Sequence, residues 1–444
     1  MQLNTVQKVT AETHGGQPAF GHQSEFQTLR RSVLSCLLWE KEFYESGVSI
    51  AERIEKCAAK VSVKDLVAVT LEARSVHNLR HVPLLLLCEL VKRGGRVVGD
   101  TIAATIQRAD ELAEFLSVYW RNGKRPLTKQ MKLGLARALR KFSAYQLAKY
   151  NRDKAVKLRD VLFLVHAKPQ DEEQAALWKQ LAENTLPVPD TWEVALSAGS
   201  DKKSTWERLL REGQLGYLAL LRNLRNMVQV SVDTGLIREA ILARKGAQRV
   251  LPFRYVAAAR ACPQLEPAID QALSEAIADM EPLDGHTIVL VDVSGSMAHP
   301  LSEKSDLQRM DAGAALASMI NGSLRVFSFS NMLAEVPPRR GMAGVDAIIN
   351  SQQHGGTALA NAIRIVNLMP HDRLICITDE QATDGRVPDP VAKRAYMINV
   401  GSYKNGVGYG RWTHIDGFSE GILRWIHVTE SEDATRQNDA EAIN

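Results

Sequence analysis

The sequence predicts a multidomain protein in which an all-α helical-repeat region is followed by an α/β domain. Amphipathic segments at helical spacing fill roughly 250 residues from Phe26 onward, with almost no strand-like alternation. Continuous apolar runs follow at 287–291 and 374–377, as expected of strands that are buried on both faces of a parallel sheet. A carboxylate lies close to the end of each run. At 444 residues, the chain is long enough for two or three domains with sizeable cores.

Composition suggests where these regions begin and end. We expect a flexible N-terminal segment at 1–23, the helical region at 24–283, the α/β domain at 284–430 and a polar tail at 431–444. No apolar run approaches the roughly 20 residues that span a bilayer, and the N-terminus does not resemble a secretory signal. The five cysteines lack Cys-x-x-Cys spacing and fit reduced thiols. These features favour a cytoplasmic protein without a membrane partner.

Short helices joined by tight turns are expected throughout the helical region. Apolar residues recur at helical spacing from Leu29 to Phe43, and breakers such as Gly94-Gly95 separate the segments that follow. Helix pairs of this size are typical of a solenoid of the HEAT type. The clearest further segments are 50–61, 63–74, 82–93, 101–120 and the Ala-rich 267–280.

Positive charge is concentrated in the helical region. The net charge is +4, yet residues 276–444 hold about 14 Lys or Arg against about 21 Asp or Glu, so the part before them is strongly basic. The stretch from Arg121 to Lys168 contains 14 basic residues but only two acidic ones, Asp153 and Asp160. Such an excess indicates an anionic partner, most often nucleic acid. The alternative is a solvated helix face, on which acidic residues normally alternate with basic ones.

A second basic pair lies near the end of the helical region. On a helix over 215–227, Leu218, Leu221 and Leu224 form an apolar stripe, with Arg222 and Arg225 beside it. The two arginines can either bind phosphates or bases, or cap neighbouring helices.

Oxygen-bearing side chains follow the first apolar run, 287–291. Asp292, Ser294 and Ser296 occupy alternate positions there, and Gly295 allows the loop to turn tightly. Open α/β sheets bind their ligands at the carboxyl ends of strands. Carboxylate and hydroxyl oxygens suit Mg²⁺, which keeps some of its waters.

Two later stretches add ligands of the same kind. Thr357 precedes a helix-like segment at 358–368, and Asp379 follows the second apolar run. With the Asp-x-Ser-x-Ser loop, this order resembles a von Willebrand factor A domain, whose metal-ion-dependent adhesion site holds one Mg²⁺. The resemblance implies Asp292, Ser294, Ser296, Thr357 and Asp379 as ligands. The alternative is a Rossmann-like domain whose site stays empty.

Over residues 24 to 428 the order of motifs resembles the Ro ribonucleoprotein family, which joins a TROVE module to a von Willebrand factor A domain. The helical motifs are Leu29-Arg30-Arg31 through Glu42-Phe43-Tyr44, Leu79-Arg80-His81-Val82-Pro83-Leu84, Gly134 to Lys141, Val165-His166-Ala167-Lys168-Pro169 and Leu220 to Met227. The resemblance implies a ring of HEAT-like helix pairs closed by the A domain. The stretch between His166 and Leu220 is shorter than in the family, which leaves the closure of the ring open.

The resemblance also implies a function and partners. Small noncoding Y-like RNA would bind the outer basic surface, single-stranded ends of misfolded RNA would enter the central hole, and an exoribonuclease would be tethered through RNA. Such a protein acts in RNA quality control without catalysis. The residue match gives Lys149, Arg152 and His166 as RNA contacts, extended by Arg137, Arg140 and Lys141. His166 follows the apolar segment 161–165, so the alternative for it is a core histidine.

Two other functions compete with an RNA-binding scaffold. A protein-binding adaptor would capture a partner carboxylate on the metal of the A domain. A metal-dependent hydrolase would use Asp292, Asp379 and Glu380 to hold Mg²⁺ and activate water. The hydrolase is disfavoured because nothing in the sequence adds a second metal site or a perturbed base.

Overall fold

The computed structural model describes residues 11–20, 23–35, 45–188, 192–197, 201–247, 250, 252–278, 280–301, 307–417, 422–423, 425–427 and 429–430. The chain divides into two compact units. The helical unit comprises 25–38 and 48–205, and the α/β unit comprises 1–24, 39–47 and 206–444. The expected fold class, a helical-repeat region followed by an α/β domain, is confirmed.

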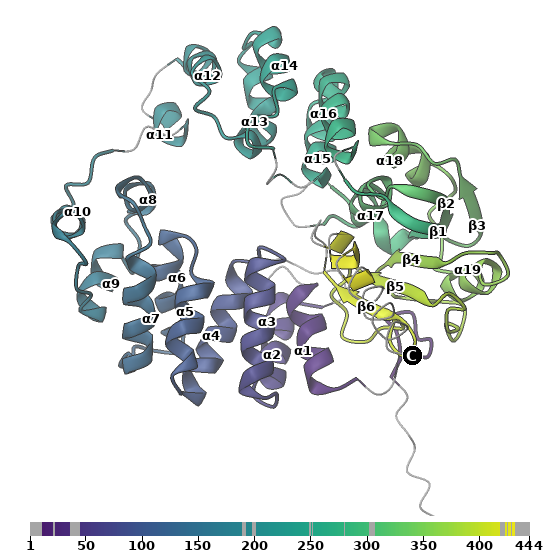
Figure 1. The fold of residues 1–444 in the computed structure, drawn as a ribbon, viewed down its shortest axis with the longest axis horizontal. Helices are drawn as coiled ribbons and strands as arrows, with labels where there is room; N and C mark the ends of the chain where they lie inside the picture. Colours follow the sequence, from purple (N-terminus) through teal and green to yellow (C-terminus); the bar gives the residue numbers. More distant parts are fainter. Residues whose placement is uncertain are drawn as a thin grey trace, which may run out of the picture. The chain divides into compact units, whose positions relative to one another are not determined.

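The helical unit consists of short helices stacked in two rows. Helices α1, α3, α5, α7 and α9 pack consecutively, and α4 packs on α6, which packs on α8 (Figure 1). This is the pairing expected of a HEAT-like solenoid. The helices are α1 (Glu25–Leu34), α2 (Gly47–Ala58), α3 (Val63–Ser75), α4 (His81–Arg93), α5 (Val97–Thr105), α6 (Ala109–Tyr119), α7 (Lys129–Leu139), α8 (Ala144–Tyr150), α9 (Leu158–Val165), α10 (Glu172–Glu183) and α11 (Trp192–Ser197).

Helices α5 and α7 approach each other closely because glycine lies at their contact. A Cβ atom on Gly134 would lie 2.7 Å from the carbonyl oxygen of Gly99 and 2.8 Å from Cβ of Ile102. Real Cβ atoms are not found at such distances, so a larger residue at 134 would push the two helices apart.

The predicted helix 101–120 is in fact two helices. α5 ends at Thr105 and α6 begins at Ala109, where the Glu111 carboxylate accepts hydrogen bonds from the backbone amides of Gln107 (2.9 Å) and Arg108 (3.1 Å). Glu111 is buried and is balanced by Arg74, whose Nη2 lies 2.8 Å from Oε1. The helical periodicity continues across the break and no Gly or Pro marks it, so the sequence pattern did not reveal it.

The α/β unit is built on one six-stranded sheet in the order β3-β2-β1-β4-β5-β6. All neighbours are parallel except β2 and β3, which are antiparallel. The strands are β1 (Leu283–Asp292), β2 (Gly322–Phe329), β3 (Leu333–Val336), β4 (Arg373–Thr378), β5 (Arg394–Asn399) and β6 (Thr413–Asp416). Because β1 and β4 are adjacent but not consecutive, their carboxyl ends flank the point at which the strand order reverses.

Helices cover both faces of this sheet (Figure 1). On one face, Gly313 of α17 (Arg309–Ser318) lies against Val291 and Ile377, and α18 (Gly341–Ile349) packs beside it. On the other face, α19 (Leu359–Val366) joins Ile288 and Leu290 in one apolar cluster. Since both faces are buried, β1 and β4 require continuous apolar runs, which is what made them recognisable in the sequence.

The last helices of the expected helical region belong to the α/β unit, so the units change at 205/206 and not near 283. The Nδ2 atom of Asn321 donates to the carbonyls of Ile277 and Met280, each at 2.9 Å, and Arg260 pairs with Asp311 (3.5 Å) and Asp346. These interactions bind the helices to the sheet layer. The helices are α13 (Tyr217–Gln229), α14 (Thr234–Leu242), α15 (Pro252–Ala261) and α16 (Glu266–Ala278), while α12 (Lys202–Arg211) spans the change of unit.

Residues 11–20 are fixed to the α/β unit and do not form the expected flexible lead-in. Thr13 Oγ1 donates to the carbonyl of Ala382 (3.1 Å), and the amide of Phe20 donates to the carbonyl of Gly406 (2.9 Å). The ring of Phe20 also lies 5.6 Å from that of Tyr409. Residues 1–10, 21–22 and 431–444, and hence the rest of the expected terminal segments, lie outside the described residues.

The cysteines agree with reduced, buried thiols as far as they are described. Cys57, Cys88, Cys262 and Cys376 are free and buried, and Cys36 lies outside the described residues. Within the described part of the chain, no helix is both long and apolar enough to cross a membrane.

Candidate metal centre and nucleic-acid interface

The five oxygen-bearing residues expected to bind a metal lie on loops at one edge of the sheet. Asp292 ends β1, Ser294 and Ser296 lie in the turn that follows, Thr357 precedes α19, and Asp379 follows β4. Asp292 and Asp379 are fully buried, and Ser294 and Thr357 nearly so. Polar side chains buried at the switch point of a parallel sheet are typical of a binding site, since burial without a function is costly.

Hydrogen bonds hold the first loop in shape. The amide of Ser294 donates to Oδ1 of Asp292 (2.9 Å), and Thr378 Oγ1 donates to its Oδ2 (2.6 Å). The hydroxyls of Ser294 and Ser296 lie 3.1 Å apart. The loop therefore presents two hydroxyls beside an oriented carboxylate.

The other two loops are tied to the first and to each other. The amide of Gly295 donates to the carbonyl of Gly355 (2.8 Å). The amide of Thr357 donates to Oγ1 of Thr383 (3.1 Å), whose own amide donates to the carbonyl of Thr357 (2.9 Å). Thr357 is therefore positioned by its contacts with Thr383 in the loop after β4, and the three loops form one connected framework.

The electrostatics of this edge favour a bound cation. Burial raises the pKa of Asp292 to about 7, and the nearby Asp379 carboxylate raises it as well. A divalent cation would relieve both effects, because it compensates the buried charge and the repulsion between carboxylates. Among the described residues there is no group of three or more His, Cys, Asp or Glu side chains placed to hold a metal. Two carboxylates with hydroxyls and waters would nevertheless fit Mg²⁺.

Glu380 does not belong to this ligand set. Its Oε2 accepts hydrogen bonds from the amides of Val407 (2.7 Å) and Gly408 (2.9 Å), and its Oε1 pairs with His414. Burial lowers the pKa of His414, but Asp416 and Glu380 outweigh this and raise it to about 9. Both oxygens of the Glu380 carboxylate thus have protein partners, so Glu380 is not available as the third metal ligand that the hydrolase alternative requires. The sequence did not predict this buried network, because its members are up to 36 residues apart in the chain.

Many cations of the basic stretch have partners on other helices. Arg121 pairs with Glu55, Arg137 with Asp100, and Lys154 with Glu114 (3.3 Å). Two further cations of the stretch bind backbone carbonyls. Arg140 donates to the carbonyl of Lys168 (2.9 Å), and Lys141 donates to the carbonyls of Ala103 and Ile106. Arg137, Arg140 and Lys141, expected to extend an RNA surface, therefore stabilise the fold as well. Counting charges along the chain missed these partners because the carboxylates lie elsewhere in the sequence.

A basic groove remains beside α7. Lys129, Lys132, Arg140, His166 and Lys168 line it, together with the apolar side chains of Leu127, Leu133, Ala136, Val165 and Ala167, and its volume is about 550 Å³. No ion pair of Lys129, Lys132 or Lys168 is found within the described residues. The groove therefore offers uncompensated positive charge over an apolar floor.

His166 is exposed, so the alternative of a core histidine is wrong. It terminates α9 in the left-handed conformation (φ 50°), which turns it out of the apolar helix face that precedes it. His166 shares the groove with Arg140, whereas Lys149 and Arg152 are not among the residues that line it.

Lys149 and Arg152 do not share the face of one helix. α8 ends at Tyr150, so Arg152 lies beyond the helix, and Arg159 lies on the next helix, α9. Lys149 Nζ lies about 6 Å from the rings of Tyr145 and Tyr150. The two cations remain close in the chain at an exposed helix end, although not by helical periodicity.

Arg222 and Arg225, the second basic pair, have different surroundings. Arg222 is exposed, while Arg225 Nε donates to the carbonyl of Ala261 (3.1 Å) and so caps the end of α15. The structure thus shows the capping alternative for Arg225, while binding by Arg222 stays a prediction. They belong to the α/β unit and not to the unit that holds the basic groove.

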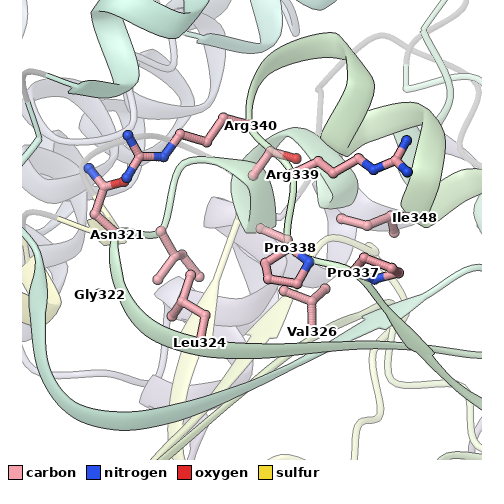
Figure 2. Close-up of a pocket in the computed structure, with 12 residues that line it drawn as sticks. Asn321, Gly322, Leu324, Val326, Pro337, Pro338, Arg339, Arg340 and Ile348 are labelled. Atoms are coloured by element: carbon pink, nitrogen blue, oxygen red, sulfur yellow. The ribbon is translucent and has the colours of Figure 1, made fainter.

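A further pocket of about 240 Å³ lies at the opposite end of β2 from the metal-site loops. Figure 2 shows an apolar floor of Leu324, Val326, Pro337 and Pro338, with Arg339 and Arg340 pointing in opposite directions at the rim. It contains none of the expected site residues.

Comparisons with known proteins agree with this architecture. Residues 182–277 match the TROVE domain family. Telomerase protein component 1 is 34% identical over 86 residues in Mus musculus and 33% in Rattus norvegicus, covering 18% of this chain but only 3% of each relative. The crystal structure of the Deinococcus radiodurans Ro (RSR) protein superposes with a TM-score of 0.60 and 18% identity, covering 91% of this chain and 98% of that one.

The fold and the matched domain define a class: a helical-repeat protein with a TROVE module and an α/β unit. Residues 182–277 are thus similar to the TROVE domain, and the fold is that of the Ro (RSR) protein, in agreement with the resemblance that the motifs indicated. The TROVE match begins in the helical unit and ends in α16, so it crosses the change of unit at 205/206.

Proposed function

We propose that this chain is a non-catalytic RNA-binding protein whose helical unit provides the main RNA surface. The observation that carries this proposal is the groove beside α7, where exposed cations without described ion pairs surround an apolar floor. Surfaces that combine positive charge with apolar contacts bind single-stranded nucleic acid. The TROVE match over residues 182–277 and the Ro-like fold support RNA as the anion.

The finer proposal follows the family. Small noncoding Y-like RNA would bind the basic surface of the helical unit, and single-stranded ends of misfolded RNA would be a second class of ligand. An exoribonuclease tethered through RNA would be the partner in RNA quality control, in the cytoplasm. Lys149, Arg152 and His166 remain proposed contacts, because all three side chains are at least partly accessible.

The α/β unit would act as a von Willebrand factor A domain that binds one Mg²⁺. Asp292 and Asp379 would supply charge, and Ser294, Ser296 and Thr357 would supply neutral oxygens. The metal would add a Lewis-acidic position able to take a water or a carboxylate. The residues of this chain fix the loops, bury the carboxylates and exclude bulk water.

RNA titrations at two salt concentrations test the proposal. Replacing Lys129, Lys132 and Lys168 by Ala should weaken RNA binding about tenfold or more. The slope of log affinity against log salt concentration should become shallower, by the amount expected for the loss of up to three phosphate contacts. The matched control replaces Lys56, Lys64 and Lys179, which are exposed cations of the same unit away from the groove. Equal losses in both triple variants would show diffuse attraction and would contradict a defined surface.

A protein-binding adaptor is the second candidate function, and the buried metal-site loops are the observation that favours it. A metal with an accessible coordination position can capture a partner carboxylate. An adaptor would keep its partner when Lys129, Lys132 and Lys168 are replaced, but would lose it when Asp292 is replaced. Capture of a protein partner that depends on Asp292, in a chain with no measurable RNA affinity, would favour the adaptor.

A further inference from the structure

A second groove of the helical unit exposes aromatic and aliphatic side chains. It lies where the end of α6 and the turn after it meet α9, and its volume is about 550 Å³, within the range of small-molecule sites. Helices α6 and α9 pack against each other (Figure 1). The groove is lined by Trp120, Lys124, Arg125, Pro126, Ala155, Val156, Asp160, Phe163 and Leu164.

Phe163 is an exposed aromatic side chain of this groove. It is 58% exposed and its neighbour Leu164 is 36% exposed, whereas Val161 and Val165 on the same helix are buried. α9 thus has a core-facing side and a second apolar side that the described residues leave uncovered. Two adjacent apolar side chains at the surface of a soluble helix indicate a contact with another molecule.

Each of the two cations that line the groove lies over an aromatic ring at the end of α6. Lys124 Nζ lies 5.8 Å from the centre of the Trp120 ring, and the Arg125 guanidinium lies 3.9 Å from that of Tyr119. The one carboxylate in the lining, Asp160, accepts a hydrogen bond from the Lys157 amide (2.9 Å) and so caps α9. The lining therefore carries two positive charges and one negative charge, and the carboxylate that bears the negative charge is hydrogen-bonded to the first turn of α9.

We propose that this groove binds an unpaired nucleobase of single-stranded RNA, with the base stacked on Phe163 and its phosphates near Lys124 and Arg125. The proposal rests on the RNA-binding function and adds a base-stacking position to it. A base fits the observations because it has a flat π-face for an exposed ring and an anionic backbone for the adjacent cations. An apolar peptide would gain nothing from Lys124 and Arg125.

The two parts of this contact respond differently to salt. Stacking of a base on Phe163 does not release counterions, whereas each phosphate neutralised by Lys124 or Arg125 does. Removing the ring should therefore weaken binding by a similar factor at every salt concentration. Removing the cations should weaken binding most at low salt.

The test uses the full chain and a single-stranded RNA that contains 2-aminopurine, whose fluorescence is quenched on stacking. Phe163→Ala should weaken binding about tenfold, abolish the quenching and leave the salt slope unchanged, while Phe163→Tyr should restore affinity and quenching. Lys124→Ala with Arg125→Ala should instead reduce the salt slope. Val76→Ala, another exposed apolar residue of the unit, is the matched control and should bind as wild type.

The outcomes separate this proposal from the function on which it rests. If the wild-type chain binds no RNA, the proposed function fails. If the wild type binds RNA and Phe163→Ala binds equally well with full quenching, the stacking site is wrong and the function stands. A Phe163→Ala variant that loses affinity only through a reduced salt slope would also contradict stacking.

Discussion

The two candidate sites of this chain are built in opposite ways. In the helical unit the functional groups are exposed cations on an apolar floor, and those in the groove have few partners among the described residues. In the α/β unit the functional groups are mostly buried side-chain oxygens on loops that hydrogen bonds hold together. An exposed charge can be changed with little effect on stability, whereas a buried polar group is coupled to the fold. Mutations should therefore separate binding from stability in one unit and combine them in the other.

The largest expected effect tests the independence of the two sites. Asp292→Ala should abolish Mg²⁺ binding, because it removes one of the two carboxylates that compensate the cation charge. RNA affinity should stay within about twofold, since the basic groove lies in the other unit. Calorimetric titration with Mg²⁺ and RNA titration of the same preparation measure both. A parallel loss of RNA affinity in a folded variant would show that the sites are coupled.

The second prediction concerns a buried ion pair of the α/β unit. Arg373 is fully buried and binds Glu430, the carbonyl of Asp284 (2.8 Å) and Thr287 Oγ1 (2.7 Å). Arg373→Met should lower the free energy of unfolding by about 3 kcal/mol, because Glu430 loses its main partner in a buried setting. Urea unfolding measures the loss.

A matched pair on the same sheet provides the control for Arg373. Arg325 pairs with Glu335 (2.8 Å), but both side chains are nearly half exposed. Arg325→Met should therefore lower the free energy of unfolding far less than Arg373→Met does. The double variant Arg373→Met with Glu430→Leu should recover much of the first loss, and failure to recover would show that packing and not charge dominates there.

The third prediction uses acid pH in the helical unit. Burial raises the pKa of Glu72, but the nearby His77 and Arg30 side chains outweigh it and lower the pKa from 4.5 to about 2. The stabilisation is thus present above pH 4.5 and is lost as the pH falls toward 2. Glu72→Gln should destabilise the unit by on the order of 2 kcal/mol at pH 7, and the difference should shrink below pH 4.5. Hydrogen exchange of α3 amides from pH 7 to 3 measures it; a pH-independent difference would contradict the linkage.

The smallest effect is expected at the exposed end of α8. Lys149→Ala with Arg152→Ala should weaken binding of a folded Y-like RNA several-fold, and of a plain single strand less, without changing the melting temperature. Arg159→Ala on α9 is the control for loss of one charge nearby. If Arg159→Ala is as harmful as the pair for both RNAs, the surface acts only through diffuse electrostatics.

The accuracy of the sequence-based predictions differed between the two units for physical reasons. Asp292, Thr357 and Asp379 could be placed at one edge of the sheet because buried strands give continuous apolar runs and their carboxyl ends meet. The roles of Arg137 and Lys141 could not be predicted, because their partners Asp100 and Ala103 lie on a different helix. Helical spacing identifies which residues share a face, but not what packs against that face.

Two further features also gave no clear signal in the sequence. The run 161–165 is apolar throughout, yet Val161 and Val165 are buried while Phe163 is 58% exposed, and exposure of an aromatic residue leaves no local signal. The boundary near residue 283 followed the change from helices to strands, whereas α13–α16 belong to the same compact unit as the sheet. A change in secondary structure is therefore not a change of folding unit.

The docking of residues 11–20 on the α/β unit also has a consequence for biosynthesis. Thr13 contacts Ala382, a residue 369 positions later in the chain. At the roughly 5 to 20 residues per second of translation, this segment leaves the ribosome about 20 to 75 s before the loop that receives it. The whole helical unit can fold during that interval, so its completion should precede that of the α/β unit.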